Sequence, residues 1–224
     1  MSQMLQIYDQ LRGMVLSLDL GPGERLTERW LETQFEGSRT PIRAALLRLE
    51  TEELVRRDGR NWMVAPIDLG EIAALAEFRE PLESTAVRLA CARATDSDLE
   101  TVVALLDSCR ADVPREAWHQ AGTDFHVELA RLSGNAFLLK AMRGVMTRLA
   151  RARWLEVLTE ASREQAWAEH RRVLEFIRRR LPDDAAHEAA AHVRATRDRL
   201  VRSLNEDRRG LRARGFAVVG QEGP

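Results

Sequence analysis

Residues Ser38–Val64 read SRTPIRAALLRLETEELVRRDGRNWMV, and this stretch decides the fold of the N-terminal part of the chain. Its first half places Ile42, Leu46 and Leu49 at helical spacing. Either Ser38 or Thr40 can cap this helix, and the first turn tolerates the proline that follows. Its second half changes to two short β-prone runs around an Asp-Gly turn. The stretch therefore predicts a helix followed at once by a β-hairpin.

Two more helices are expected before this stretch. Ile7, Leu11 and Val15 fall on one face of a first helix, which stops at the glycine and proline residues of positions 21–23. Thr27 can cap a second helix, which ends before Ser38. Three helices and a hairpin over residues 1–66 predict a winged helix-turn-helix domain.

The remainder of the chain is predicted to be helical. Helical periodicity between breaking residues predicts helices near residues 69–94, 97–111, 115–132, 136–159, 163–180 and 184–206. Residues 67–207 should therefore form a six-helix bundle, and the whole protein should be mainly α. Residues 208–224 are rich in Arg and Gly with only a short apolar patch, which favours a flexible tail.

The composition excludes some classes of protein and leaves others open. The 224 residues carry a formal net charge of -1, so any binding of nucleic acid must come from local placement of charge. Two cysteines give no disulfide framework. The N-terminus does not read as a signal peptide, and no apolar run is long enough to span a bilayer. We expect a cytoplasmic protein with no membrane partner.

Three segments carry a resemblance to a known family. PGERLTE at 22–28, SRTPIR at 38–43 and ALLRLE at 45–50 closely resemble the GntR family of bacterial repressors. The resemblance implies that the partner is double-stranded operator DNA and that the second segment opens the recognition helix. It implies DNA contacts by Ser38, Arg39, Thr40 and Arg43 on that helix, by Arg25 near the second helix, and by Gly59 and Arg60 at the tip of the wing.

The residue types agree with this role on chemical grounds. A guanidinium group in the first turn of a helix can reach guanine acceptors or phosphate oxygens, and the helix dipole also favours phosphate. The alternative is a solvated, arginine-rich helix. One departure concerns the end of the recognition helix, where Glu53 replaces a glycine that is usual in the family and lacks its freedom at positive φ.

The second domain resembles the FCD ligand-binding domain of the FadR subgroup of that family. The matching pieces are Phe78-Arg79, Leu82-Glu83, Phe125-His126, the segment 132–135 (LSGN), Glu169-His170 and His192-Val193. The Ala- and Leu-rich helices of this domain carry more apolar surface than one small bundle easily hides, which predicts a homodimer, and we expect the domain to sense a small organic acid. Arg79, Arg148 and Asn135 are the candidate effector-binding residues.

Three histidines form a candidate metal site. Many FCD domains bind a divalent metal through an Asp and a His one helical turn apart and two later histidines, and His126, His170 and His192 match the histidines. Each shares a helical face with apolar residues, so all three should point into the bundle and converge, as Zn, Ni or Mn would require. Gly122 stands where the Asp is expected. Without a metal, the same cavity could bind an anionic effector.

These observations predict an effector-responsive repressor that binds a pseudo-palindromic operator as a dimer. An alternative from another class is a metal-dependent enzyme that uses the histidine cluster. Against it, the sequence pairs no general base with the histidines and has no nucleophile motif such as Gly-x-Ser-x-Gly. A helical adaptor without DNA binding is a second alternative.

Overall fold

The chain folds into two compact units, one of which combines both ends of the sequence. The computed structural model describes residues 2–108, 113–156 and 159–220. Residues 1–69 and 204–224 form the first unit, and residues 70–203 form the second. The predicted fold class, a winged helix-turn-helix followed by a helical domain, is confirmed.

Three helices build the N-terminal part of the first unit: α1 (Gln3–Leu16), α2 (Glu28–Phe35) and α3 (Arg39–Thr51). The Thr27 side chain accepts a hydrogen bond from the backbone N–H of Trp30 and so caps α2, as its sequence position predicts. Leu11, Leu31 and Leu46, one from each helix, are fully buried in a shared core. Burial of this apolar face is what holds the short helices together.

A three-stranded antiparallel sheet completes the wing, with β1 (Arg25–Leu26), β2 (Val55–Asp58) and β3 (Asn61–Val64) in the order β1-β3-β2. Asp58 pairs with Asn61, so only two residues turn the hairpin, and Gly59 at the first of them has a φ of 61°. Glu53, just past the end of α3, has a φ of 57°. The chain therefore uses a left-handed conformation at the position where the family resemblance leads one to expect glycine, at a cost of about 1–2 kcal/mol.

The expectation of a flexible tail is wrong for the residues that the structure describes. Arg208–Ala213 form α10, and Val218–Val219 form β5, which pairs in parallel with β4 (Ile67–Asp68). The backbone N–H of Ala217 donates to the carbonyl of Pro22, 2.7 Å away. Phe216 is 9% exposed and lies over Gly21, where a Cβ atom would come within 2.6 Å of its ring. Residues 221–224 lie outside the described part.

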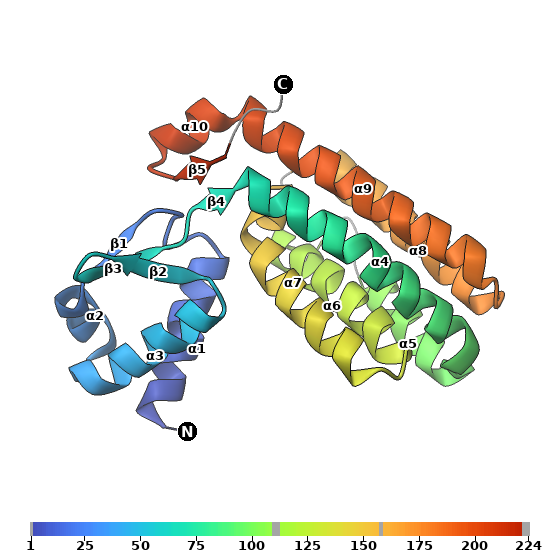
Figure 1. The fold of residues 1–224 in the computed structure, drawn as a ribbon, viewed down its shortest axis with the longest axis horizontal. Helices are drawn as coiled ribbons and strands as arrows, with labels where there is room; N and C mark the ends of the chain where they lie inside the picture. Colours follow the sequence, from blue (N-terminus) through green and yellow to red (C-terminus); the bar gives the residue numbers. More distant parts are fainter. Residues whose placement is uncertain (1, 109–112, 157–158, 221–224) are drawn as a thin grey trace. The chain divides into compact units, whose positions relative to one another are not determined.

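The described residues of the second unit form six helices (Figure 1): α4 (Leu69–Arg93), α5 (Asp96–Asp107), α6 (Arg115–Leu132), α7 (Ala136–Glu156), α8 (Glu160–Arg178) and α9 (Pro182–Glu206). The predicted ends of two helices, near 111 and 159, fall at or beside residues 109–112 and 157–158, which are outside the described part. α8 begins three residues earlier than predicted because Thr159, rather than Ser162, caps it. Within the described residues, no helix is both long and apolar enough to cross a membrane.

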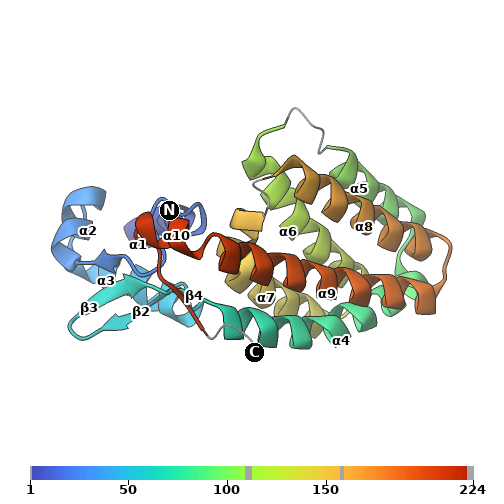
Figure 2. The ribbon, with the colours of Figure 1, turned by 90° about the horizontal axis from the view of Figure 1, so that it is seen from above.

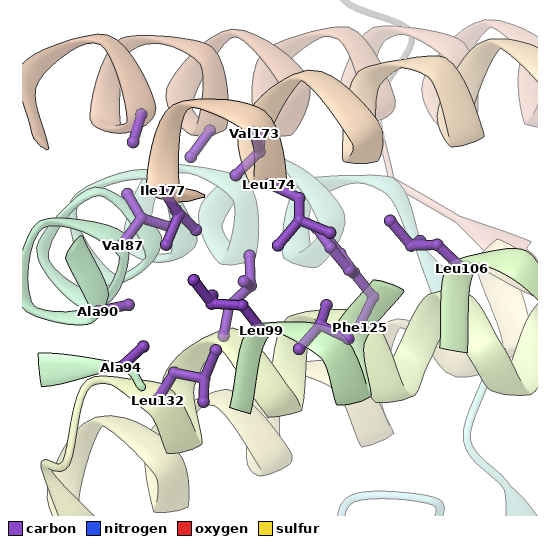
Figure 3. Packing of buried hydrophobic residues seen from close by; sticks show 14 of the residues in the cluster. Val87, Ala90, Ala94, Leu99, Leu106, Phe125, Leu132, Val173, Leu174 and Ile177 are labelled. Atoms are coloured by element: carbon purple, nitrogen blue, oxygen red, sulfur yellow. The ribbon is translucent and has the colours of Figure 1, made fainter. Parts of the chain in front are cut away.

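One apolar core cluster of this unit lies between α4, α5, α6, α8 and the first half of α9. Figure 3 shows Leu99, Phe125 and Leu174, from three different helices, pointing toward a common centre. α4 and α9 run antiparallel and side by side in both Figure 1 and Figure 2, and the Ser84 hydroxyl donates to the Ala186 carbonyl between them. This arrangement brings one face of α9 toward residues of α6 and α8, where the histidines lie.

Candidate metal centre and DNA interface

Three imidazole rings meet inside the second unit. His126 on α6, His170 on α8 and His192 on α9 are each no more than 3% exposed. Their ring centroids are 4.7–5.1 Å apart, and one nitrogen from each can be chosen so that all three lie within 4.8 Å of one another. The convergence predicted from the helical phase is confirmed.

Two buried carboxylates stand behind the rings. Glu169 Oε2 lies 2.7 Å from His192 Nδ1, and Glu83 Oε1 lies 3.1 Å from His126 Nδ1. We assign the Nδ1 proton of both imidazoles to these contacts, which leaves each Nε2 with a lone pair. This pairing of a carboxylate with a histidine is the arrangement that orients metal ligands in proteins.

Electrostatics keep the imidazoles neutral and Glu169 charged. Burial lowers the pKa of all three histidines, and the nearby positive charges of Arg79 and Arg153 lower that of His126 further. Burial alone would raise the pKa of Glu169, but hydrogen bonds from His192 and Arg199 outweigh it and lower the pKa to about 2. Neutral imidazoles are the protonation state that a metal ion requires of its histidine ligands.

The donor set fits a divalent cation. His170 Nε2 and His192 Nε2 are 3.3 Å apart, and two ligands of a tetrahedral zinc at ~2.0 Å would be separated by about the same distance. Among the described residues, His170 Nδ1 is buried without a hydrogen-bond partner. If its proton is on Nδ1, two Nε2 lone pairs face one another, which a cation between them would stabilise.

An arginine occupies the place of the missing fourth ligand. A Cβ atom built on Gly122 would lie 2.7 Å from Nη2 of Arg153, so the guanidinium group fills the space that an Asp side chain would use. Arg153 is buried and donates to the Thr123 hydroxyl. The described protein ligands for a metal are therefore three neutral imidazoles with no carboxylate among them.

The three candidate effector-binding residues lie in different environments. Arg79 is 2% exposed, forms an ion pair with Glu83 and lies with Nη2 2.8 Å from His126 Nε2, so it belongs to the histidine cluster. Arg148 forms an ion pair with Glu71 at 2.6 Å. Asn135 caps α7, because its side-chain oxygen accepts from the backbone N–H groups of residues 137 and 138. Of the three, the described contacts link only Arg79 to the imidazoles.

The candidate DNA-binding residues are exposed on the first unit. Ser38, Arg39, Thr40 and Arg43 lie at the start of α3, and Gly59 and Arg60 form the tip of the hairpin. Ser38 precedes the helix as its N-cap residue but makes no side-chain capping bond, so its hydroxyl is not used within the helix.

Three of the four arginines predicted to bind DNA, Arg25, Arg39 and Arg43, are each paired with a carboxylate. Arg43 donates from Nε and Nη2 to the two oxygens of Glu28, at 2.6 and 3.0 Å, and Arg39 donates from Nε to Glu32 at 2.7 Å. Arg25 lies 3.0 Å from Asp58 of the wing. These partners were not foreseen, because the paired residues are 7 to 33 positions apart and only the folded domain brings them together.

Comparison with known proteins identifies the family. Residues 3–64 match the model for bacterial regulatory proteins of the gntR family, and residues 74–195 match the FCD domain. The chain is 31% identical over 191 residues to the Nta operon transcriptional regulator of Aminobacter aminovorans, across 84% of this chain and 90% of that protein. This chain belongs to the GntR family and carries an FCD domain.

Two further proteins are similar to this chain over most of their length. The repressor NanR of Escherichia coli K12 is 26% identical over 211 residues, which cover 84% of this chain and 80% of NanR. The solved structure of E. coli McbR/YncC superposes with a TM-score of 0.74 at 21% identity, over 92% of this chain and all of that one. Family and relatives are transcriptional regulators, so the alternative of a metal-dependent enzyme is not favoured.

Sequence reasoning missed the groups that surround the predicted ligands. Glu83 and Glu169 are part of the FCD motifs, and the available signal was that Glu83 lies one helical turn after Arg79 and that Glu169 directly precedes His170. Nothing in the sequence indicated that Arg153 would lie over Gly122.

Proposed function

We propose that this GntR-family protein is an effector-responsive repressor that binds a pseudo-palindromic operator as a homodimer and senses a small organic acid in its FCD domain. One observation carries the sensing part: three neutral imidazoles converge from separate helices, two of them with a buried carboxylate behind the ring. A core that only needed filling would use apolar side chains, because buried polar groups are costly unless they are paired.

His126, His170 and His192 are proposed to hold one divalent metal ion, Zn, Ni or Mn, with Glu83 and Glu169 orienting two of the rings. The ion would act as a Lewis acid that binds a carboxylate oxygen of the effector. Three neutral ligands leave its charge of 2+ uncompensated, so an anionic effector suits the open positions better than a neutral one. Arg79 would have to move away from Nε2 of His126 before that nitrogen could bind the metal. The guanidinium group of Arg79 could then form an ion pair with the anionic effector.

The chain itself offers a route from this site to the DNA-binding unit. His192 lies on α9, and the residues from Leu204 onward belong to the first unit. A ligand that shifts α9 can therefore act on the DNA-binding unit along the backbone. Such coupling requires the effector to bind the two domain arrangements with different affinity.

Elemental analysis tests the metal. Protein purified without chelators should contain close to one divalent ion per chain, and His170→Ala should contain much less. His187→Ala, which removes an exposed histidine from α9, is the matched control and should retain the ion. Wild-type protein that stays free of metal after incubation with Zn, Ni and Mn would remove the metal from the proposal.

DNA binding is tested on a duplex selected from a random library by the wild-type protein. Arg43→Ala should weaken binding to this duplex by about 1–3 kcal/mol without unfolding the protein, because the side chain is on the exposed face of α3. An unchanged titration would exclude Arg43 from the interface. Failure of the wild-type protein to enrich any sequence would contradict sequence-specific repression.

A further inference from the structure

The ion pairs between α2 and α3 have an unusual arrangement for surface charges. Glu28 and Glu32 are one helical turn apart on α2, and their partners Arg43 and Arg39 are one turn apart on α3. Two carboxylates of α2 thus lie opposite two arginines of α3, the expected recognition helix. Exposed ion pairs add little to stability, so stability alone does not account for two carboxylates beside arginines that are candidates for binding an anion.

The geometry of the Arg43 pair determines which side of the guanidinium group remains available. Arg43 gives Glu28 its Nε and Nη2 hydrogens, which lie on one edge of the planar group. Three of the five N–H donors are left over, two on Nη1 and one on Nη2. One hydrogen on Nη1 and one on Nη2 lie together on the end edge of the guanidinium group, which can bind O6 and N7 of guanine with two parallel hydrogen bonds.

Burial places the carboxylate behind the arginine. The Arg43 side chain is 58% exposed, whereas that of Glu28 is 20% exposed. The hydrogen bond from Arg43 lowers the pKa of Glu28, so the carboxylate is ionised at neutral pH. Glu28 therefore fixes the plane of the guanidinium group from the protein side while the free edge points outward.

We propose that Glu28 is a positioning residue for base recognition, which holds Arg43 for a bidentate contact with guanine and keeps it from binding phosphate. This inference rests on the proposed contact of Arg43 with DNA. A guanidinium group that is free to rotate would bind the nearest phosphate. A phosphate contact raises the affinity for every DNA sequence equally and does not distinguish one sequence from another. The Glu28 carboxylate offsets the positive charge of Arg43 and fixes the direction of its guanidinium group. Arg43 therefore contributes less to non-specific DNA affinity and more to discrimination between base sequences.

Glu28→Gln tests the proposal, since glutamine keeps the size of the side chain and removes its charge. On the selected duplex, binding should weaken on the order of threefold to tenfold, part of the roughly 5- to 150-fold that a bidentate guanine contact contributes to discrimination. On a scrambled duplex, binding should become tighter, and the slope of log K against log salt should steepen by up to about 0.9 as Arg43 gains a phosphate. A merely structural defect would weaken binding to both duplexes.

Two further variants complete the experiment. Glu36→Gln removes an exposed carboxylate at the end of the same helix and should leave the ratio of specific to non-specific affinity unchanged. In an Arg43→Ala background, Glu28→Gln should have no further effect on that ratio, because the group it positions is gone. The proposal is overturned if Glu28→Gln leaves the ratio unchanged, or if it lowers the ratio equally with and without Arg43. Loss of selection by the wild-type protein itself would instead count against the proposed function.

Discussion

Acidification of the metal-free protein should destabilise it in a way that can be calculated from the histidine cluster. His126 and His170 are buried with a pKa well below 6.5, mainly because burial disfavours the charged form. At pH 7.5 these groups are neutral in both folded and unfolded chains. Below pH 6.5 the unfolded chain binds protons that the folded chain excludes, so stability falls as pH falls. Each histidine contributes about 1.4 kcal/mol at pH 5.5, or about 3 kcal/mol for the two.

Two other ionisable groups of the cluster, His192 and Glu169, also have shifted pKa values. The lowered pKa of His192 acts in the same direction. Glu169, with a pKa of about 2, contributes stability that is present above its unfolded value near 4.5 and is lost only in stronger acid, so it changes little between pH 7.5 and 5.5.

Urea unfolding with a chelator present, followed by circular dichroism at the two pH values, measures the effect. His170→Phe replaces the ring that stacks on Phe125 with another aromatic ring and should reduce the loss by about 1.4 kcal/mol. His187→Asn, at an exposed position on α9, should leave the loss as it is. An equal free energy of unfolding at pH 5.5 and 7.5 would refute the neutral, buried cluster.

Three other outcomes are expected. Gly23→Ala should lower the melting temperature in differential scanning calorimetry more than Gly59→Ala does. Both sites have a positive φ, but only at Gly23 would a Cβ atom clash with another residue, Ala217 at 2.5 Å. Equal shifts of the melting temperature would mean that the C-terminal segment is not docked at Gly23. Glu169→Gln should weaken metal binding by about 10–100-fold in a chelator competition assay, and unchanged affinity would remove its orienting role. Light scattering should give the mass of a dimer with and without DNA, and a monomeric mass in both conditions would contradict the repression mechanism.

The helices were predictable from sequence and the end of the chain was not, for one physical reason. The faces of α1 and α3 are set by residues three and four apart, such as Ile42, Leu46 and Leu49, so a local pattern contains the information. β5 has only two residues, and its partner β4 lies far back in the sequence. The Arg- and Gly-rich composition of 208–224 was a correct observation, but tertiary pairing overrode it.

In the candidate site, too, local features could be predicted from the sequence and long-range contacts could not. The inward direction of the three histidines follows from the helix period, so their convergence could be predicted. The ion pair of Arg148 with Glu71 depends on how separate helices pack, which the period does not reveal. Asn135 follows Gly134 between two helices, and this local signal favours the capping role that the structure assigns to it.

The pairing of β4 with β5 has a consequence for how the protein is made. During synthesis at 5–20 residues per second, roughly 150 residues must be added between the two strands, which takes about 8–30 s. Throughout that time the carbonyl of Pro22 and the N–H of Ile67 lack the partners that Ala217 later provides. The nascent chain can form its recognition helix early, but the DNA-binding unit is completed only after the entire ligand-binding domain has been translated.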